Sequence, residues 1–308
     1  MSSPDISLTK KILVSVAGML SFLPDAVFVS LKYFVKLHRF PNLRNPKRFS
    51  EWMQWYKIKY RNPNMLTCVD KYAVRGFVEK RGYGKYLNDL YQVCETAEQI
   101  DFDSLPLQFV IKTTDGGNGD NVLVCTDKSS LDLPETIHKL NSWRHKKLES
   151  IGREWAYSGS ASDSRLIVEK YLSDPHSEDG SIDDYKILCF DGKFQYLWVD
   201  KNRYSDHHRG FWNEQLEFLP QVISDHPTFE KAPTLPENVQ EMISIAENLA
   251  KGFPFARIDF YNIEGKITFG EITFYPWSGY CQYTPDSFDY ELGSHFSKQH
   301  LICPPKKR

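Results

Sequence analysis

Two acidic residues in the C-terminal part of the sequence could bind a divalent cation. Asp259 lies two residues after Arg257, and Glu271 lies in the next apolar segment of the chain. Mg²⁺ commonly takes one or two carboxylates and completes its shell with phosphate oxygens and water. An arginine beside such a pair can hold a phosphoryl or carboxylate group through two parallel hydrogen bonds. The residues around the acids are mostly apolar, and burying unpaired carboxylates is costly. The residues are compatible with a metal and phosphate site; a surface hairpin with solvated charges is the alternative, and the apolar surroundings of the acids argue against it.

A lysine near the middle of the chain precedes a glycine-rich loop. Lys112 directly follows the apolar segment 109–111. The loop contains Gly116, Gly117, Asn118 and Gly119. Glycine lets backbone N–H groups approach phosphate oxygens, and the lysine ammonium adds a point charge. No Gly-Lys-Ser/Thr closes the loop, so it is not a Walker A motif. The pattern is typical of a polyphosphate-binding flap, although a simple hairpin turn has the same signature.

Two further segments could contact a nucleotide. The first follows an apolar strand at 166–168, whose end offers backbone groups that can read an adenine edge. It consists of Glu169, Lys170, Tyr171 and Leu172. The second is Asp184-Tyr185-Lys186, which begins the next predicted strand, so that Lys186 could reach a γ-phosphate. Either segment alone is more often ordinary surface.

The spacing of apolar residues predicts the elements that position these groups. We expect helices over residues 50–60, 70–81, 134–148 and 237–251. We expect strands over residues 109–111, 122–124, 166–168, 185–190, 194–199, 255–261 and 266–273. A helical start followed by hairpins mixed with helices indicates an α+β protein.

The two acids must share one face of their hairpin if they bind the same cation. A four-residue loop at 262–265 would put Glu271 on the opposite face from Asp259, because strand side chains alternate. A fifth loop residue would set Asp259 opposite Phe269 and make the two acids diagonal neighbours. We therefore predict an odd loop or a bulge, with both carboxylates on one face within about 6 Å of each other.

Six motifs in this order resemble the ATP-grasp superfamily, and most closely its TupA-like branch, named after teichuronopeptide synthesis. They are NLRNPK at 42–47, DKYAVR at 70–75, GREW at 152–155, EKYL at 169–172, DYK at 184–186 and TFYP at 273–276. The resemblance covers roughly residues 35–280. It implies an ATP-grasp fold, in which two α+β lobes clasp ATP. The implied division is a shortened helical N-terminal region (1–69), a small lobe with the flap (70–170) and a large lobe with the metal site (171–308).

The resemblance also implies a role for each candidate residue. Arg75 and Lys112 would hold the phosphates of ATP under a flap formed by residues 116–119. Residues 169–172 would be the adenine-binding linker, and Lys186 would reach the γ-phosphate. Asp259 and Glu271 would bind Mg²⁺, and Arg257 would steady an acyl phosphate. Two features depart from the family pattern: Thr273 stands where many relatives have Asn, and Asp115 and Asp120 make the flap acidic.

The implied reaction is ATP-dependent amide formation. A carboxylate attacks the γ-phosphorus, and an amine then captures the acyl phosphate. In this branch the implied acid is a uronic acid of a cell-surface polysaccharide, such as a capsule, or its precursor; an acidic amino acid is the alternative. The amine would be an amino acid or small amine. Aromatic residues are candidates for sugar binding, with core packing as the alternative: Trp198, Tyr204, Phe211, Trp212, Trp277 and Tyr280. A basic cluster could bind an anionic glycan, with a solvated loop as the alternative: Arg203, His207, His208 and Arg209.

Three other functions are possible from the sequence. A glycosyltransferase would need an Asp-x-Asp metal motif, and Asp101-Phe102-Asp103 has that form without a preceding apolar strand. A sugar kinase on the same fold would stop at a phosphorylated product. A non-catalytic assembly protein would not need both acids and three phosphate-directed bases.

The charge and the composition of the chain bear on the partners that it could bind and on its cellular location. A net charge of −2 gives no reason to expect nucleic-acid binding. The six cysteines are dispersed, which argues against zinc and disulfides and favours the cytoplasm. Residues 12–37 should form two short amphipathic helices, too short to span a membrane. We expect them to pack on the body of the protein, with peripheral contact at the inner membrane face as the alternative. The oligomeric state is not determined by the sequence.

Overall fold

The protein is described from a computed structural model. It describes residues 22–115, 121–144, 152–158, 164–177 and 179–297. The predicted flap residues Gly116, Gly117, Asn118 and Gly119 lie outside the described residues, as does the predicted helix before residue 22.

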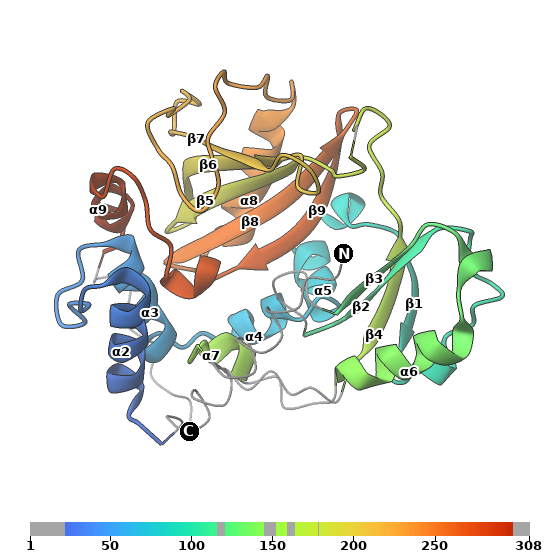
Figure 1. The fold of residues 1–308 in the computed structure, drawn as a ribbon. Coiled ribbons are helices and arrows are strands. Elements are labelled where there is room, and N and C mark those ends of the chain that lie inside the picture. The colour runs from blue at the N-terminus through green and yellow to red at the C-terminus, as the bar shows by residue number, and fades with distance from the viewer. Residues whose placement is uncertain (1–21, 116–120, 145–151, 159–163, 178, 298–308) are drawn as a thin grey trace.

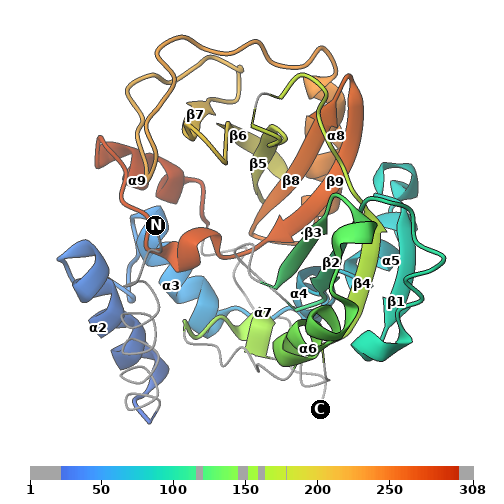
Figure 2. The same cartoon turned by 45° about the vertical axis from the view of Figure 1, so that its right-hand side comes forward.

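Two antiparallel sheets form the framework (Figure 1). The smaller has the strand order β1-β4-β2-β3, with β1 Leu90–Cys94, β4 Leu166–Lys170, β2 Phe109–Thr113 and β3 Val122–Cys125. The larger has the order β7-β6-β5-β8-β9, with β7 His208–Trp212, β6 Lys193–Lys201, β5 Asp184–Phe190, β8 Phe255–Ile263 and β9 Lys266–Thr273. Turned by 45°, the smaller sheet still lies beside β9 (Figure 2). The two sheets confirm the predicted α+β class.

The smaller sheet has one apolar face and one mixed face. Phe109, Ile111 and Val168 alternate onto the apolar face and pack with Leu140 of α6 (Leu133–Arg144). Lys112 and Glu169 fall on the other face by the same alternation. The alternation of the strands therefore places Lys112 and Glu169 on the face opposite the one that packs with α6.

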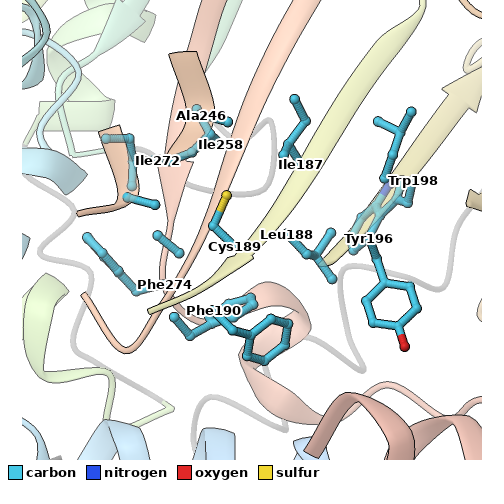
Figure 3. Close-up of a cluster of buried hydrophobic side chains, with 14 of the residues drawn as sticks. Ile187, Leu188, Cys189, Phe190, Tyr196, Trp198, Ala246, Ile258, Ile272 and Phe274 are labelled. Atoms are coloured by element: carbon cyan, nitrogen blue, oxygen red, sulfur yellow. The ribbon is translucent and has the colours of Figure 1, made fainter. Parts of the chain in front are cut away.

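The larger sheet is covered on one face by α8 (Val239–Ala250). Ile187, Cys189 and Ile258 lie in the core that includes Ala246 of α8, as Figure 3 shows. Every residue of β5 is buried, so the polar residues on its other face are enclosed as well. These polar residues form the candidate site below.

Helices from the N-terminal part complete the core of the larger sheet. They are α3 Phe49–Lys59, α4 Pro63–Val69 and α5 Ala73–Lys80, and α2 Asp25–Leu37 contacts α3. Met53 of α3 and Val78 of α5 are fully buried in one cluster with residues of the larger sheet. The hydrophobic core thus groups α3 to α5 with that sheet, and the predicted boundary at residue 70 falls within this group. No helix in the described part is long and apolar enough to cross a membrane.

The predicted elements are found with shifted ends, and several elements were missed. The helix predicted over 70–81 begins only at Ala73, because the Asp70 carboxylate accepts hydrogen bonds from the backbone N–H groups of Tyr72 and Ala73, at 2.9 Å and 2.6 Å. The patterns gave no indication of α4, β1 or β7, nor of α7 (Trp155–Ser158) and α9 (Ser287–Ser294). Four short 3-10 helices are η1 Gly84–Tyr86, η2 Ala97–Gln99, η3 Lys128–Ser130 and η4 Pro276–Gly279.

Candidate active site

The face of the larger sheet opposite α8 carries a row of buried charged residues. Residues directly opposite each other on antiparallel strands point to the same side. Lys186 of β5 is opposite Asp259 of β8, which is itself opposite Glu271 of β9. Asp184 is opposite Asp200 of β6. Acids and bases from neighbouring strands are thereby brought together on one surface.

A bulge places the two predicted metal ligands on the same face. The β8–β9 turn is only two residues, Glu264 and Gly265, both with positive φ (51° and 81°). The register shifts between Asp259 and Phe260, which leaves Gly270 as the extra residue. A Cβ on Gly270 would lie 3.0 Å from the Asp259 carbonyl oxygen, so glycine fits this close approach.

The bulge prediction is therefore confirmed, and the predicted pairing is wrong. Glu271 lies directly opposite Asp259 instead of diagonal to it. The predicted longer loop is absent because the backbone makes a tight turn at Glu264 and Gly265 and inserts its odd residue within β9. The outcome for the side chains is the same, since both acids face the same side of the sheet.

Arg257 joins the two acids. Its Nε and Nη2 donate to Asp259 at 2.7 Å and 2.6 Å, and Nη2 also contacts Glu271 Oε1 at 3.3 Å. Asp259 Oδ2 and Glu271 Oε1 both contact Arg257 Nη2, at 2.6 Å and 3.3 Å, so these two oxygens lie less than about 6 Å apart. Thr273 donates to Glu271 Oε1 at 3.0 Å and accepts from Nη2 at 3.0 Å, so this hydroxyl orients the glutamate.

Both acids are chemically suited to a cation. Burial alone would raise the pKa of Asp259, but the charges of Arg257 and Lys186 outweigh it and hold that pKa below its usual range. The carboxylate is therefore ionised at neutral pH. Glu271 has a half-exposed side chain and faces outward from the same row. Two carboxylates on one face fit the number that Mg²⁺ takes when phosphate oxygens complete its shell.

Lys186 is enclosed by carboxylates. Its ammonium donates to Asp184 and, at 3.2 Å, to Asp259, and lies 3.8 Å from Asp200. Arg203 donates to Asp184 at 2.9 Å. Burial raises the pKa of Asp184, and its Oδ1 has no hydrogen-bond partner among the described residues. Lys186 thus neutralises part of the acidic row and lies beside the proposed metal ligands.

Several of the aromatic and basic candidates for sugar binding are buried or make contacts within the protein. Arg209 donates to both oxygens of Asp200, at 2.5 Å and 3.2 Å, and His207 Nε2 contacts the same carboxylate at 3.1 Å. Trp198 is buried beneath Arg209 and stacks on Trp277 with ring centroids 4.4 Å apart. Phe211 and Trp212 are likewise buried, whereas Tyr204 is exposed.

The smaller sheet and α5 each contribute one phosphate-directed base. Lys112 Nζ lies 2.9 Å from Glu169 Oε2, and Arg75 Nη1 lies 3.2 Å from Glu169 Oε1. The sequence places these residues far apart, and the fold gathers them around one carboxylate. The two bases predicted to hold the ATP phosphates are thus brought together, with Glu169 between them.

The predicted adenine linker follows β4 directly. The backbone N–H of Lys170 donates to the Asp89 carbonyl at 2.9 Å, and its carbonyl accepts from Asn88 Nδ2 at 2.9 Å. Both main-chain groups of Lys170 are therefore occupied. Tyr171 and Leu172 extend beyond the strand, where the chain leaves the smaller sheet.

Lys71 is a candidate that the motif reading passed over. Its backbone N–H donates to the Thr114 carbonyl at 2.8 Å, which ties the start of α5 to the end of β2. Burial lowers the pKa of its ammonium, the Glu271 charge opposes this, and the Lys112 charge adds to it. Lys71 therefore lies within electrostatic reach of both lobes' site residues. Its position in the DKYAVR motif was the available signal.

Comparison with known proteins gives one family. A family model described as TupA-like ATPgrasp matches residues 51–297. No curated protein matches the chain.

Among solved structures, the chain is similar to D-alanine–D-alanine ligase from Bacillus anthracis, with 18% identity, 67% of this chain covered and a TM-score of 0.41. It spans 57% of the length of that ligase. It is also similar to the Helicobacter pylori D-alanine–D-alanine ligase (15% identity, 83% of this chain and 68% of that chain, TM-score 0.44). A third is the L-amino acid ligase from Bacillus licheniformis (15%, 71% and 46%, TM-score 0.43).

Proposed function

Because the chain belongs to the TupA-like ATP-grasp family, we propose that it is an ATP-dependent ligase that joins a carboxylic acid to an amine through an acyl phosphate. The observation that supports this best is the position of Arg257, which contacts both Asp259 and Glu271 while Lys186 donates to the same Asp259 oxygen. In this arrangement the two proposed cation ligands are in direct contact with the bases that would bind phosphate.

The nucleotide would lie between the two sheets. Lys112 and Arg75 would exchange their contacts with Glu169 for contacts with ATP phosphates, supplying point charge and a planar fork of donors respectively. The segment 116–119 is proposed as the flap over the triphosphate. The backbone of Tyr171 and Leu172, with the side chain of Lys170, would border the adenine.

Asp259 and Glu271 would hold magnesium, which when bound neutralises charge on the transferred phosphoryl group. Lys186 would approach the γ-phosphate from the β5 side. Arg257 uses Nε and Nη2 for the two acids, and in the described part of the chain no acceptor contacts its Nη1. That nitrogen would donate to the acyl phosphate.

The chemistry follows from these positions. A substrate carboxylate oxygen attacks the γ-phosphorus, the bond to the β-phosphate oxygen breaks, and ADP leaves. The amine then attacks the acyl carbon, the C–O bond to phosphate breaks, and an amide and phosphate result. The enzyme needs no covalent nucleophile, since positioning and electrostatic stabilisation account for catalysis.

The substrate class is a finer part of the proposal. The branch resemblance supports a uronic acid of a cell-surface polysaccharide or its precursor as the acid, and an amino acid or small amine as its partner. We do not propose a nucleic-acid partner. The described cysteines are all buried and unpaired, which is compatible with a cytoplasmic enzyme.

A glycosyltransferase has less support. Phe102 of the Asp-x-Asp segment is buried in the small-lobe core, and Asp101 accepts a hydrogen bond from the backbone N–H of Ser104 at 3.3 Å. The segment is thus part of a loop on the smaller sheet, away from the charged row. A kinase would use the same row, so only the product can separate it from a ligase.

Membrane contact through residues 12–37 is a separate part of the proposal. α2 buries Val29 and Tyr33, and it exposes Val27, Leu31, Phe34 and Val35 next to Lys36. Basic and apolar residues together suit an anionic bilayer surface. Co-sedimentation with anionic vesicles should be lost in Val35→Asp, with Glu95→Asp as a control; equal binding by Val35→Asp would exclude contact through this face.

The proposed activity is tested by an ADP-release screen of uronic acids crossed with amino acids and small amines. We expect ADP only when an acid is present, and a product mass equal to acid plus amine minus water. A phosphorylated sugar as the final product would indicate a kinase instead. No ADP with any acid would contradict the proposed ligase.

A further inference from the structure

A strained turn follows the proposed metal strand. Trp277, Ser278 and Gly279 of η4 all have positive φ, at 49°, 56° and 71°. Two consecutive non-glycine residues in this region cost energy and persist only where surrounding contacts hold them. Gly279 cannot be replaced easily, because a Cβ there would lie 2.4 Å from the Met53 side chain.

Two buried polar side chains of α3 donate hydrogen bonds to the backbone of this turn. Gln54 Nε2 donates to the carbonyls of Ser278 and Gly279 at 3.2 Å and 3.1 Å. Lys57 Nζ donates to the Ser278 carbonyl at 2.8 Å. These contacts fix the backbone of the turn and hence the direction of its side chains.

Lys57 also activates two hydroxyl groups. Its ammonium is fully buried and donates to Ser278 Oγ at 3.1 Å and Tyr280 Oη at 3.4 Å. In the described part of the chain, no carboxylate lies within salt-bridge distance of this charge. Each hydroxyl accepts from Lys57, so Tyr280 can donate its proton to a ligand, and Ser278, which donates to Glu154, can do so once an amino group occupies Glu154. Burial lowers the pKa of Lys57 to about 7, and a ligand carboxylate beside the two hydroxyls would favour its charged form. The two donors over this amine therefore suit a carboxylate.

An opposite charge lies immediately beside these donors. Glu154 is half-buried and accepts the proton of Ser278 Oγ. Donors backed by a cation on one side and a carboxylate on the other match the two ends of a zwitterionic amino acid. A simple amine would use only the Glu154 side of this cluster.

The cluster is adjacent to the proposed reaction centre. Trp277 stacks on Trp198 at 4.4 Å, and the Arg257 guanidinium lies 4.7 Å from the Trp198 ring. On the other side, burial and the charges of Glu271 and Glu154 raise the pKa of Tyr157, so this ring lies within the field of both acids. A ligand at Ser278 would thus border the site where the acyl phosphate is expected.

We propose that Ser278, Tyr280 and Glu154, with Lys57 beneath them, form the acceptor subsite, and that the amine substrate is an α-amino acid. The two hydroxyls bind its carboxylate, and Glu154 binds its amino group. This inference rests on the proposed ligase function and names the amine class that the function requires.

Direct binding tests the subsite without requiring turnover. The probes are the common amino acids, each paired with the amine formed by its decarboxylation, measured by ligand-observed NMR on the full chain. At least one amino acid should bind, and its decarboxylated partner should bind at least about tenfold more weakly, because a charge-assisted contact is lost. Tyr280→Phe and Ser278→Ala should each weaken amino-acid binding by about tenfold, and Glu154→Gln should weaken the amino acid and the amine alike.

The control is Tyr91→Phe, which removes a hydroxyl from an exposed position on β1 and should change nothing. Affinity for a non-hydrolysable ATP analogue should be equal in all these variants. No amino-acid binding, equal binding of the decarboxylated amine, or unchanged binding in Tyr280→Phe would each overturn the subsite. Tyr280-dependent binding without ADP release from any acid would leave the subsite standing and remove the ligase function. ADP release at equal rates with amines that lack a carboxylate would leave the ligase function standing and remove the subsite.

Discussion

Replacing Lys112 by alanine should weaken ATP binding without unfolding the protein. Lys112 is the penultimate residue of β2, its ammonium lies 2.9 Å from Glu169, and its side chain is 27% exposed. A hydrogen bond from a charged donor to phosphate contributes about 1.5–3 kcal/mol. Its loss corresponds to a dissociation constant about 10- to 150-fold higher. The effect should lie toward the upper end, because Glu169 would keep only Arg75 as a counter-charge and would repel the phosphates more strongly.

The stability cost of the same change should be small. Glu169 retains its contact with Arg75 at 3.2 Å, and the lost ion pair is partly exposed, so we expect about 1 kcal/mol or less. Calorimetric titration with a non-hydrolysable ATP analogue and Mg²⁺ measures the affinity, and urea titration measures the stability. Lys85→Ala is the matched control, since Lys85 is 72% exposed and lies 3.9 Å from Glu241. Unchanged nucleotide affinity in a folded Lys112→Ala variant would remove Lys112 from the site.

Four other predictions follow from the same contacts. Glu271→Gln should abolish ADP formation at unchanged melting temperature, because its side chain is 49% exposed, whereas Glu264→Gln in the same hairpin should stay active; ADP formation by Glu271→Gln would remove it from the metal ligands. Asp259→Asn should also be inactive, and its free energy of unfolding in urea titration should fall by about 3 kcal/mol, because buried Arg257 loses its bidentate partner. An unfolding free energy equal to that of the wild type would contradict a stabilising Arg257–Asp259 ion pair. Burial lowers the pKa of Lys57 to about 7, with Glu154 opposing and Lys32 adding, below the unfolded value of 10.5. The unfolded chain therefore binds more protons between these values, and stability should rise across that window relative to Lys57→Met; parallel pH profiles would contradict this. Deleting residues 1–37 should lower the melting temperature, because Val29 and Tyr33 of α2 are fully buried; a fully active, equally stable truncation would show that α2 does not support the fold.

The sequence predicted the strands that carry the site because their apolar residues alternate clearly. The charged face could be inferred from the acids themselves, since Asp259 lies between two buried residues, Ile258 and Phe260. The register could not be inferred, because it depends on a bulge at Gly270, and a glycine within a strand does not reveal on which side the extra residue falls.

One strand that escaped prediction, β7, has a clear physical cause. β7 contains Arg209, which is buried because it pairs with Asp200 on the neighbouring strand. A buried ion pair has the composition of a surface loop, so the apolar pattern is broken where tertiary contacts compensate the charge. Lys57 is similar, since only the fold brings the Ser278 carbonyl to its ammonium.

Trapping with hydroxylamine tests the central claim most directly. The protein is incubated with ATP, Mg²⁺, hydroxylamine and each uronic acid in turn, and the masses of the products are measured by mass spectrometry. An acyl phosphate reacts with hydroxylamine, so the account predicts a hydroxamate of the acid formed in equal amount with ADP, and neither product with Glu271→Gln. ADP formation that depends on the acid but yields a stable phosphorylated sugar and no hydroxamate would contradict the account.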